Sequence, residues 1–195
     1  MPHADTEPRV ELTTLRARDA APVRQWLRDF HRAHGRAWVG ALNLGWADGE
    51  TDAQLLASDI VERYAAALFA AARRDDALVV VARLGERPIG ALWLSLSRQD
   101  HLAVPVGVVQ WVYVSEWARG NRVGSALMEA GREWLRMRGV RGLQVSVLAD
   151  NEPAMRLYQR AGLRVADVRM MGSVDIAEDG AGGGSAGARA SVTGR

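Results

Sequence analysis

The residues from Val108 to Ser125 combine an apolar strand with a short Arg/Gly-rich turn that leads directly into a helix. At the start of a helix the first backbone N–H groups have no partner within the helix, and the helix dipole adds partial positive charge there. Gly120 and Gly124 have no side chain to hinder a ligand, and Gly120 can adopt backbone angles that turn several N–H groups toward one point. The pattern predicts a phosphate cradle, able to bind a diphosphate largely through the main chain.

Two common nucleotide-binding loops are excluded by the residues present. The chain has no lysine, so it cannot form the G-x-x-x-x-G-K-[ST] loop, and it also lacks the G-x-G-x-x-G spacing of dinucleotide-binding folds. Because a Gly-rich turn between a strand and a helix is common, its identity depends on the sequence that follows it.

A second motif follows a second apolar run, Leu143 to Leu148. The motif reads N-x-x-A-x-x-L-Y-x-x-x-G from Asn151 to Gly162, and the turn before it reads R-G-x-x-V-G-x-A-L from Arg119 to Leu127. This order resembles the GNAT superfamily of acyl-CoA N-acyltransferases over roughly residues 108–165. The resemblance implies an α/β (α+β) fold, with a mixed, mostly antiparallel sheet splayed between strands 4 and 5 and flanked by about four helices.

The resemblance also implies acetyl-CoA as co-substrate. Its pantetheine arm would enter the gap between the strands expected at 107–114 and 143–148 and pair with the first of them, and main-chain pairing of this kind tolerates almost any side chain. The residues implied in cofactor binding are Val112, Val114, Arg119, Gly120, Asn121, Arg122, Val123, Gly124, Ser125 and Asn151.

Arg122 departs from the family pattern, which has Gly at this place. An Arg in helical geometry still offers its N–H group. Two interpretations of its guanidinium stay open: a charged contact with a CoA phosphate, or a solvated side chain at a helix start.

Tyr158 occupies the place of the family tyrosine that often protonates the departing thiolate. A phenol with a pKa of about 10 is protonated at neutral pH and can donate to a thiolate as the C–S bond breaks. The alternative is a half-buried aromatic ring that packs beside Leu157. Asn151 lies near the cofactor arm in the family, and it is also a good helix N-cap; the two roles are compatible.

The reaction implied is direct attack of a primary amine of a small molecule on the thioester in a ternary complex. Because amines are mostly protonated at pH 7, a base or a water chain must take a proton. Many family members carry a Glu near the start of the fourth strand, where Val108 or Val109 stands here. The other candidates, each also interpretable as a solvated surface residue, are Asp48, Glu50, Asp100, His101 and Glu116.

The family places the loop between its first two helices beside the acceptor pocket, and that loop is expected here at 34–50. Trp38, Trp46, Asp48 and Glu50 lie in it, and aromatic faces with carboxylates suit a cationic amine. Alternatively, both tryptophans pin a long loop onto the core. Trp93 and Trp111, on expected strands, can line either the core or the pocket.

Periodicity and cap residues predict the elements that position these groups. Strands are expected at 10–16, 77–84, 88–96, 107–114 and 143–148, with one or two final strands within 165–176. Helices are expected from Asp19 through Phe30, from 51 or 52 to about 73, over 123–138 and from Asn151 to about Gly162. The helix at 123–138 is expected to bury Val123, Leu127, Ala130, Trp134 and Met137.

Composition bounds the function further. The chain has 195 residues, no cysteine and a net charge of only +2, with all 25 basic residues arginine, so nucleic-acid binding is not expected. The apolar runs are too short for a membrane span and there is no N-terminal apolar leader, so a cytoplasmic protein is expected. Residues 1–176 are expected to form one domain, and the Gly/Ala/Ser-rich residues 177–195 a disordered tail.

Several alternatives stay open at this point. A protein or peptide N-terminal or side-chain acetyltransferase belongs to the same class, and a non-catalytic acyl-CoA-binding regulatory module belongs to another. Tyr158 favours an enzyme, whereas the missing Glu on the fourth strand keeps the regulatory module open. No metal site is expected, and a homodimer is compatible with the resemblance.

Overall fold

The computed structural model describes residues 9–98 and 104–173. The elements are β1 (Val10–Thr14), the 3-10 turn η1 (Ala17–Asp19), α1 (Ala20–Ala41), α2 (Asp48–Ala57), α3 (Ile60–Ala71), β2 (Ala77–Leu84), β3 (Arg87–Arg98), β4 (Pro105–Val114), the 3-10 turn η2 (Glu116–Ala118), α4 (Val123–Met137), β5 (Gly142–Val145) and α5 (Glu152–Arg160). The sequence 177–195 and residues 99–103 lie outside the described part.

The strands form one mixed sheet in the order β1-β2-β3-β4-β5. The first four strands are antiparallel neighbours, and β5 runs parallel to β4. The predicted hairpin between the second and third strands is confirmed, with Leu84 opposite Arg87 and Gly85 at a φ of 58° in the turn. The predicted mixed, mostly antiparallel α/β architecture is therefore confirmed.

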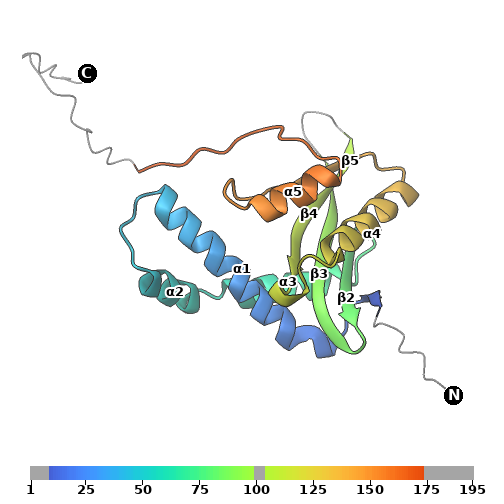
Figure 1. The fold of residues 1–195 in the computed structure, drawn as a ribbon, viewed down its shortest axis with the longest axis horizontal. Helices are drawn as coiled ribbons and strands as arrows, with labels where there is room; N and C mark the ends of the chain where they lie inside the picture. Colours follow the sequence, from blue (N-terminus) through green and yellow to red (C-terminus); the bar gives the residue numbers. More distant parts are fainter. Residues whose placement is uncertain (1–8, 99–103, 174–195) are drawn as a thin grey trace, which may run out of the picture.

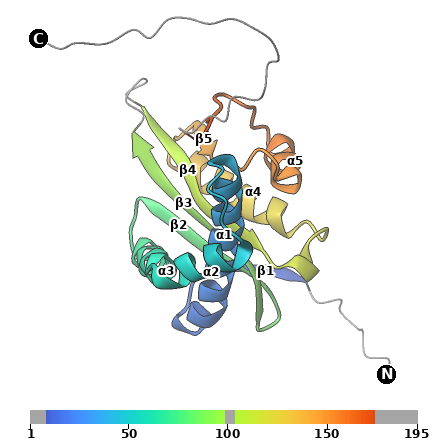
Figure 2. The same cartoon turned by 90° about the vertical axis from the view of Figure 1, so that its left-hand side faces the viewer.

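The two faces of the sheet carry different helices, as Figures 1 and 2 show. One apolar core joins the sheet to α4 and α5, around Leu92, Leu94 and Leu127. The other joins it to α1 and α3, around Val23, Leu68 and Trp111. Trp111 is therefore a core residue.

The splay of the sheet begins in the middle of β4. Trp93 lies opposite Trp111 and Leu94 opposite Val109, which leaves Gln110 as the extra residue of a bulge. Pairing with β5 covers only four positions and ends at Val109 opposite Val145. The last five residues of β4, 110–114, consequently keep a free edge on the side of β5, as the predicted splay requires.

The first helix is longer than predicted. The loop expected at 34–50 is wrong, because α1 continues to Ala41 and α2 begins at Asp48, so that only 42–47 connect them. The extension is stabilised by packing on α2, where a side chain on Gly35 would meet Thr51 Cγ2 at 3.2 Å. Arg32 also pairs with Asp52 at 2.8 Å. These contacts between helices override the local sequence pattern.

The second predicted helix, from 51 or 52 to about 73, is two helices. α2 ends at Ala57, and the next residue, Ser58, has an extended backbone with ψ 145° and a hydroxyl that donates to Leu55 O at 2.9 Å. α3 then starts after Asp59. Ser and Asp side chains compete with helical hydrogen bonds in this way, which explains the break.

The C-terminal half shows three further differences. Met137 of α4 is 69% exposed, so its predicted burial is wrong, whereas Val123, Leu127 and Trp134 are buried as predicted. The fifth strand is shorter than 143–148, since β5 ends at Val145. The final strands expected at 165–176 are absent from residues 165–173, and 174–176 lie outside the described residues.

A buried ion pair fixes the start of α1 against the sheet. Arg83 Nη2 donates to Asp19 Oδ1 at 2.6 Å and to Oδ2 at 2.7 Å, and both side chains are almost fully buried. Arg83 Nε also donates to Thr13 Oγ1, and Arg16 N donates to Asp19 Oδ2. Asp19 stands at the predicted cap position of α1, but its carboxylate joins β1, β2 and η1 instead of capping α1.

Candidate active site

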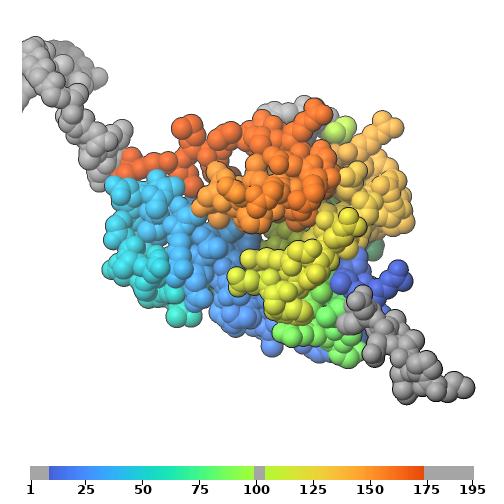
Figure 3. All heavy atoms as spheres, in the orientation of Figure 1, coloured from blue at the N-terminus to red at the C-terminus, as the bar shows by residue number. Residues whose placement is uncertain are grey.

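A large cavity opens where the sheet splays. It encloses about 1260 Å³ between the end of β4, the start of α4, α5 and α1. Figure 3 shows the same face hollowed between α5 in orange, the start of α4 in yellow and α1 in blue. The cavity is thus bounded by segments far apart in the sequence.

The free edge of β4 forms the floor of this cavity. Val112, Tyr113 and Val114 line it, beyond the point where pairing with β5 stops. An extended chain can add to such an edge through main-chain hydrogen bonds. The structure therefore places the backbone predicted to hold pantetheine along an accessible, unpaired strand edge.

The predicted cradle follows directly after β4. The turn passes through Gly120, whose φ is 84°, and α4 begins at Val123. At the start of α4, Ala126 N–H donates the first helical hydrogen bond, to Arg122 O at 3.0 Å. The N–H groups of 123–125 come before this bond and have no acceptor within the helix. These donors, at the positive end of the helix dipole, lie on the cavity wall.

Arg122 has a left-handed backbone, with φ 58° and ψ 9°. The expectation that it sits in ordinary helical geometry is wrong. A left-handed conformation is open to Gly without strain and costs other residues about 1–2 kcal/mol, which gives a physical reason for a Gly at this place in the family pattern. Arg122 tolerates the conformation and brings a guanidinium to the wall of the cradle.

Two predicted cradle residues have different surroundings from those expected. A side chain on Gly124 would meet Leu157 Cδ2 at 3.1 Å, so this glycine allows α5 to pack closely on α4 as well as leaving room for a ligand. Asn121 is exposed and does not belong to the cavity lining. The other predicted positions line the cavity: Val112, Val114, Arg119, Gly120, Arg122, Val123, Gly124, Ser125, Asn151 and Tyr158.

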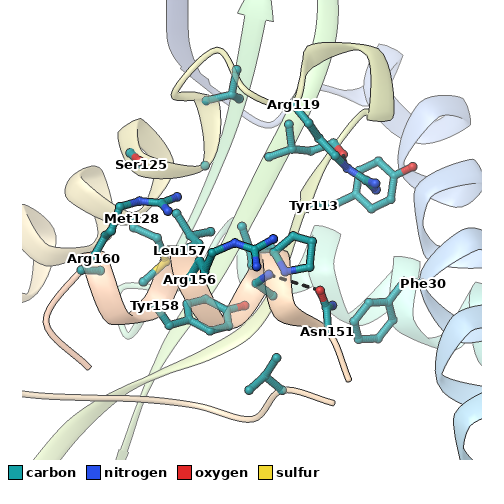
Figure 4. A pocket seen from close by; sticks show the side chains of 18 of the residues that line it. Phe30, Tyr113, Arg119, Ser125, Met128, Asn151, Arg156, Leu157, Tyr158 and Arg160 are labelled. Atoms are coloured by element: carbon teal, nitrogen blue, oxygen red, sulfur yellow. Dashed lines mark hydrogen bonds between the residues drawn. The ribbon is translucent and has the colours of Figure 1, made fainter. Parts of the chain in front are cut away.

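The cavity wall carries more positive than negative side chains. Its arginines are Arg119, Arg122, Arg132, Arg156 and Arg160, and its carboxylates are Asp29, Glu116 and Glu129. Arg156 pairs with Glu152 at 2.8 Å, whereas within the described residues Arg122 and Arg160 have no ion-pair partner. Figure 4 shows Arg156 and Arg160 projecting from α5 toward the space beside α4. An anionic ligand suits this wall.

Asn151 and Tyr158 come to the cavity from one short helix. Asn151 caps α5, since its side-chain oxygen accepts from Ala154 N at 3.2 Å. Tyr158 lies two turns later with its ring 7% exposed, and Figure 4 shows its hydroxyl on the side facing Asn151. Burial raises the pKa of Tyr158 to about 12, so the phenol is protonated at neutral pH. A protonated phenol on the cavity wall is able to donate a proton.

The α1 wall contains residues that the sequence did not single out. Asp29, Phe30, Ala33 and His34 face the cavity from successive turns of α1. Tyr113 donates its hydroxyl to Asp29 Oδ2 at 3.2 Å, and Trp26 stacks on Tyr113 with 5.4 Å between ring centroids. In sequence, these residues share the periodicity of an ordinary amphipathic helix, so no local signal marks them.

Of the segment expected as the acceptor loop, 34–50, only its first residue, His34, lines the cavity. Trp38, Trp46, Asp48 and Glu50 are absent from its lining, because the helical extension of α1 carries this segment away from the splay. Of the other predicted bases, Glu116 lines the cavity beside the cradle, whereas Asp100 and His101 lie outside the described residues. Val109, one of two positions expected to replace the family Glu, is buried in the core.

Among residues 9–98 and 104–173, no group of three or more metal-binding side chains could hold an ion. No helix in that part of the chain combines the length and the apolar character needed to cross a membrane.

Comparison with known proteins agrees with this geometry. The model of the acetyltransferase (GNAT) family matches residues 46–163. A mycothiol acetyltransferase of Brachybacterium faecium is 31% identical over 130 residues, which are 66% of this chain and 37% of that protein. The chain therefore spans less than half the length of the curated relatives it matches.

Solved structures share the fold at low identity. An acetyltransferase structure from Pyrococcus furiosus aligns with a TM-score of 0.61 and 18% identity, over 83% of this chain and 97% of that one. An aminoglycoside N-acetyltransferase solved with CoA aligns with a TM-score of 0.55 and 14% identity, over 84% and 93% of the two chains. The family match, the splayed sheet and the motifs agree: this chain belongs to the acetyltransferase (GNAT) family, as the sequence predicted.

Proposed function

We propose that this chain transfers the acetyl group of acetyl-CoA to a primary amine of a small molecule, by direct attack in a ternary complex. The observation that carries the proposal is the continuity of the free β4 edge with the start of α4. Residues 110–114 offer unpaired main chain, and Val123, Gly124 and Ser125 offer N–H groups at the next helix start. In CoA an extended pantetheine arm is joined to a diphosphate. The arm would pair with the free edge of β4, and the diphosphate would then meet the N–H groups at the start of α4.

Each part of the cavity has a distinct role in this proposal. The cradle and its arginines hold the diphosphate, the edge of β4 holds the arm, and a main-chain N–H of that edge stabilises the oxyanion. Tyr158 donates its phenolic proton to the thiolate as the C–S bond breaks. The amine approaches from the α1 wall, which Asp29 and Phe30 line and where Figure 4 shows Phe30 across the cavity from α5.

The size and charge of the α1 wall support a small, cationic acceptor. Asp29 has no ion-pair partner among the described residues, and its neighbours Phe30 and Tyr113 present aromatic rings. A carboxylate with aromatic faces attracts an ammonium group. The relative named for mycothiol and the fold neighbour named for aminoglycosides also act on small molecules.

A thiol-release assay with acetyl-CoA tests the proposal. The acceptor panel contains spermidine, kanamycin, glycine, an alanine tripeptide and the amine that mycothiol acetyltransferases acetylate, with calorimetric binding of acetyl-CoA measured beside it. Turnover of a small amine supports the proposal. Turnover of the peptide alone would assign a peptide acetyltransferase, and tight binding with no turnover would assign a regulatory module.

A further inference from the structure

The amine must lose a proton before it can attack, and the cavity wall offers a limited set of groups to take it. The titratable side chains on the wall, apart from arginine, are Asp29, His34, Tyr113, Glu116, Glu129 and Tyr158. The inference that follows rests on the proposed function, because a base is needed only where an amine reacts.

Five of these groups are poorly suited to act as the base. Burial raises the pKa of both Tyr113 and Tyr158, which keeps them protonated. Glu116 lies before α4 and Glu129 in its second turn, toward the end of the cavity where we place the diphosphate. Asp29 accepts a hydrogen bond on each oxygen, from Gln25 at 3.0 Å and from Tyr113 at 3.2 Å.

His34 is held in a single tautomer by its own helix. Its Nδ1 lies 3.0 Å from the carbonyl oxygen of Phe30. Since a carbonyl can only accept, Nδ1 carries the hydrogen and Nε2 carries the lone pair. The imidazole also lies against the Phe30 ring, with 4.0 Å between centroids, so the orientation of the ring is restricted.

The basic nitrogen of His34 is free for a substrate. Among the contacts of the described residues, Nε2 has neither a hydrogen bond nor an ion pair, and His34 is half-buried on the cavity wall. Its neighbour His31 is turned into the core between Phe30 and Tyr64. Burial lowers the pKa of His31 to about 4, so His31 remains neutral beside His34 above pH 5.

We propose that His34 is the general base of the reaction and that its Nε2 takes a proton from the primary ammonium group of the acceptor. The neutral amine then attacks the thioester carbon, a C–N bond forms and the C–S bond breaks. The thiolate receives the proton of Tyr158, and the second proton of the attacking nitrogen returns to Tyr158 through water. The imidazolium of His34 releases the first proton to solvent, so that one proton is released per acetyl group transferred.

The pH dependence of turnover tests this role, using the panel amine with the highest turnover. In the wild type, kcat/KM should fall at low pH by tenfold per pH unit, as expected for a single group that must be free of its proton. His34→Gln should be about 100-fold slower at pH 7, and the difference should shrink toward pH 9 as the amine deprotonates unaided. Acetyl-CoA affinity, measured by calorimetry, should not change.

Two variants separate His34 from its neighbours. His31→Phe removes the buried histidine and should keep the fall of kcat/KM at low pH, which is the acidic limb of the pH profile. Asp29→Asn tests the nearest carboxylate and should change KM for the amine while the limb remains. The other charged groups that face α1 across the cavity are Glu116, Glu129 and the five arginines of the wall, and none of them is altered in these variants.

Nitrogen NMR of the histidine rings gives a readout independent of turnover. The expected spectrum shows the Nδ1–H tautomer for His34, and its titration should coincide with the bend of the kcat/KM profile. An Nε2–H tautomer, or a limb that persists in His34→Gln, would overturn the inference while leaving acetyl transfer intact. Absence of turnover of every amine by the wild type would overturn the proposed function and this inference together.

Discussion

The two ends of the cavity offer a ligand different groups: main chain at one end and side chains at the other. At the cradle end, a ligand meets main-chain N–H groups after a turn that includes Gly120, and side chains only supplement them. At the α1 wall, a ligand meets side chains of an uninterrupted helix, among them Asp29, Phe30 and His34. The cradle end, where we propose that acetyl-CoA binds, is therefore formed mainly by backbone groups, and the α1 wall, where we propose that the amine binds, by side chains.

This difference predicts that a substitution at one end of the cavity leaves ligand binding at the other end unchanged. Changes at the α1 wall should alter kinetics toward the amine, and changes at the cradle should alter affinity for acetyl-CoA. The changes below run from the largest expected effect to the smallest.

Removal of Asp19 should have the largest effect on stability. Asp19→Ala leaves the guanidinium of Arg83 buried without its carboxylate, and breaking a buried pair costs about 3–5 kcal/mol. Urea denaturation should show this loss in the free energy of unfolding. Because the ion pair anchors the start of α1, the KM for the amine should rise more than the Kd for acetyl-CoA. A loss below 1 kcal/mol would show that the pair is not a major anchor.

Tyr158→Phe should lower kcat about 100-fold, because among the described residues Tyr158 is the one phenol or carboxylic acid that α5 contributes to the cavity wall. In the described part of the chain the Tyr158 hydroxyl makes no hydrogen bond within the protein, so the fold should tolerate its loss. The thiol-release assay measures kcat, and calorimetry should give unchanged acetyl-CoA affinity. Equal turnover by the variant would remove Tyr158 from the mechanism.

Ser125→Asp should weaken acetyl-CoA binding about tenfold, since it places a negative charge beside the diphosphate at an exposed position. The same charge in the first turn of α4 should leave the free energy of unfolding unchanged or raise it by about 0.5 kcal/mol. Ser125→Asn is the matched neutral control. This pair is a sharper test than Gly124→Glu, which would also collide with Leu157.

Unchanged calorimetric affinity in Ser125→Asp, with Ser125→Asn also unchanged, would contradict the position of the cradle. An equal loss in both variants would assign the effect to shape instead of charge.

Arg122→Gly should raise the free energy of unfolding by up to about 1 kcal/mol. The left-handed backbone is strained for Arg and free for Gly, although the greater chain entropy of Gly offsets part of the gain. Thermal denaturation measures the change. A parallel calorimetric titration decides between the two interpretations of the guanidinium: weaker acetyl-CoA binding indicates a phosphate contact, and equal binding indicates a solvated side chain.

The sequence identified the cradle end because special backbone geometry demands particular residues. Gly120 supplies a positive φ, and Asn151 caps α5. Both roles favour a particular residue type at a fixed position in the motif, so both can be recognised in the sequence. The order of strands and the splay could be predicted because the motifs at 119–127 and 151–162 resemble those of the GNAT family, whose fold has both features. The bulge at Gln110 could not, because one polar residue within an apolar strand is equally compatible with regular pairing.

The α1 wall could not be predicted because tertiary contacts determine it. The sequence pattern predicts a loop from residue 34, yet the small size of Gly35 lets α2 pack on α1 and the helix continues to Ala41. His34 therefore lies on a helix facing the cavity and not in a mobile acceptor loop. Which face of α1 meets the splay depends on Trp26 and the ion pair of Asp19, and both contacts are made to distant strands.

Amide hydrogen exchange with and without acetyl-CoA tests the central claim most directly. The account predicts slower exchange in peptides covering 110–114 and 119–125 when acetyl-CoA is present, and no change across α2 at 48–57. Binding of acetyl-CoA without protection of either segment would contradict the placement of the co-substrate between the splayed strand edge and the start of α4.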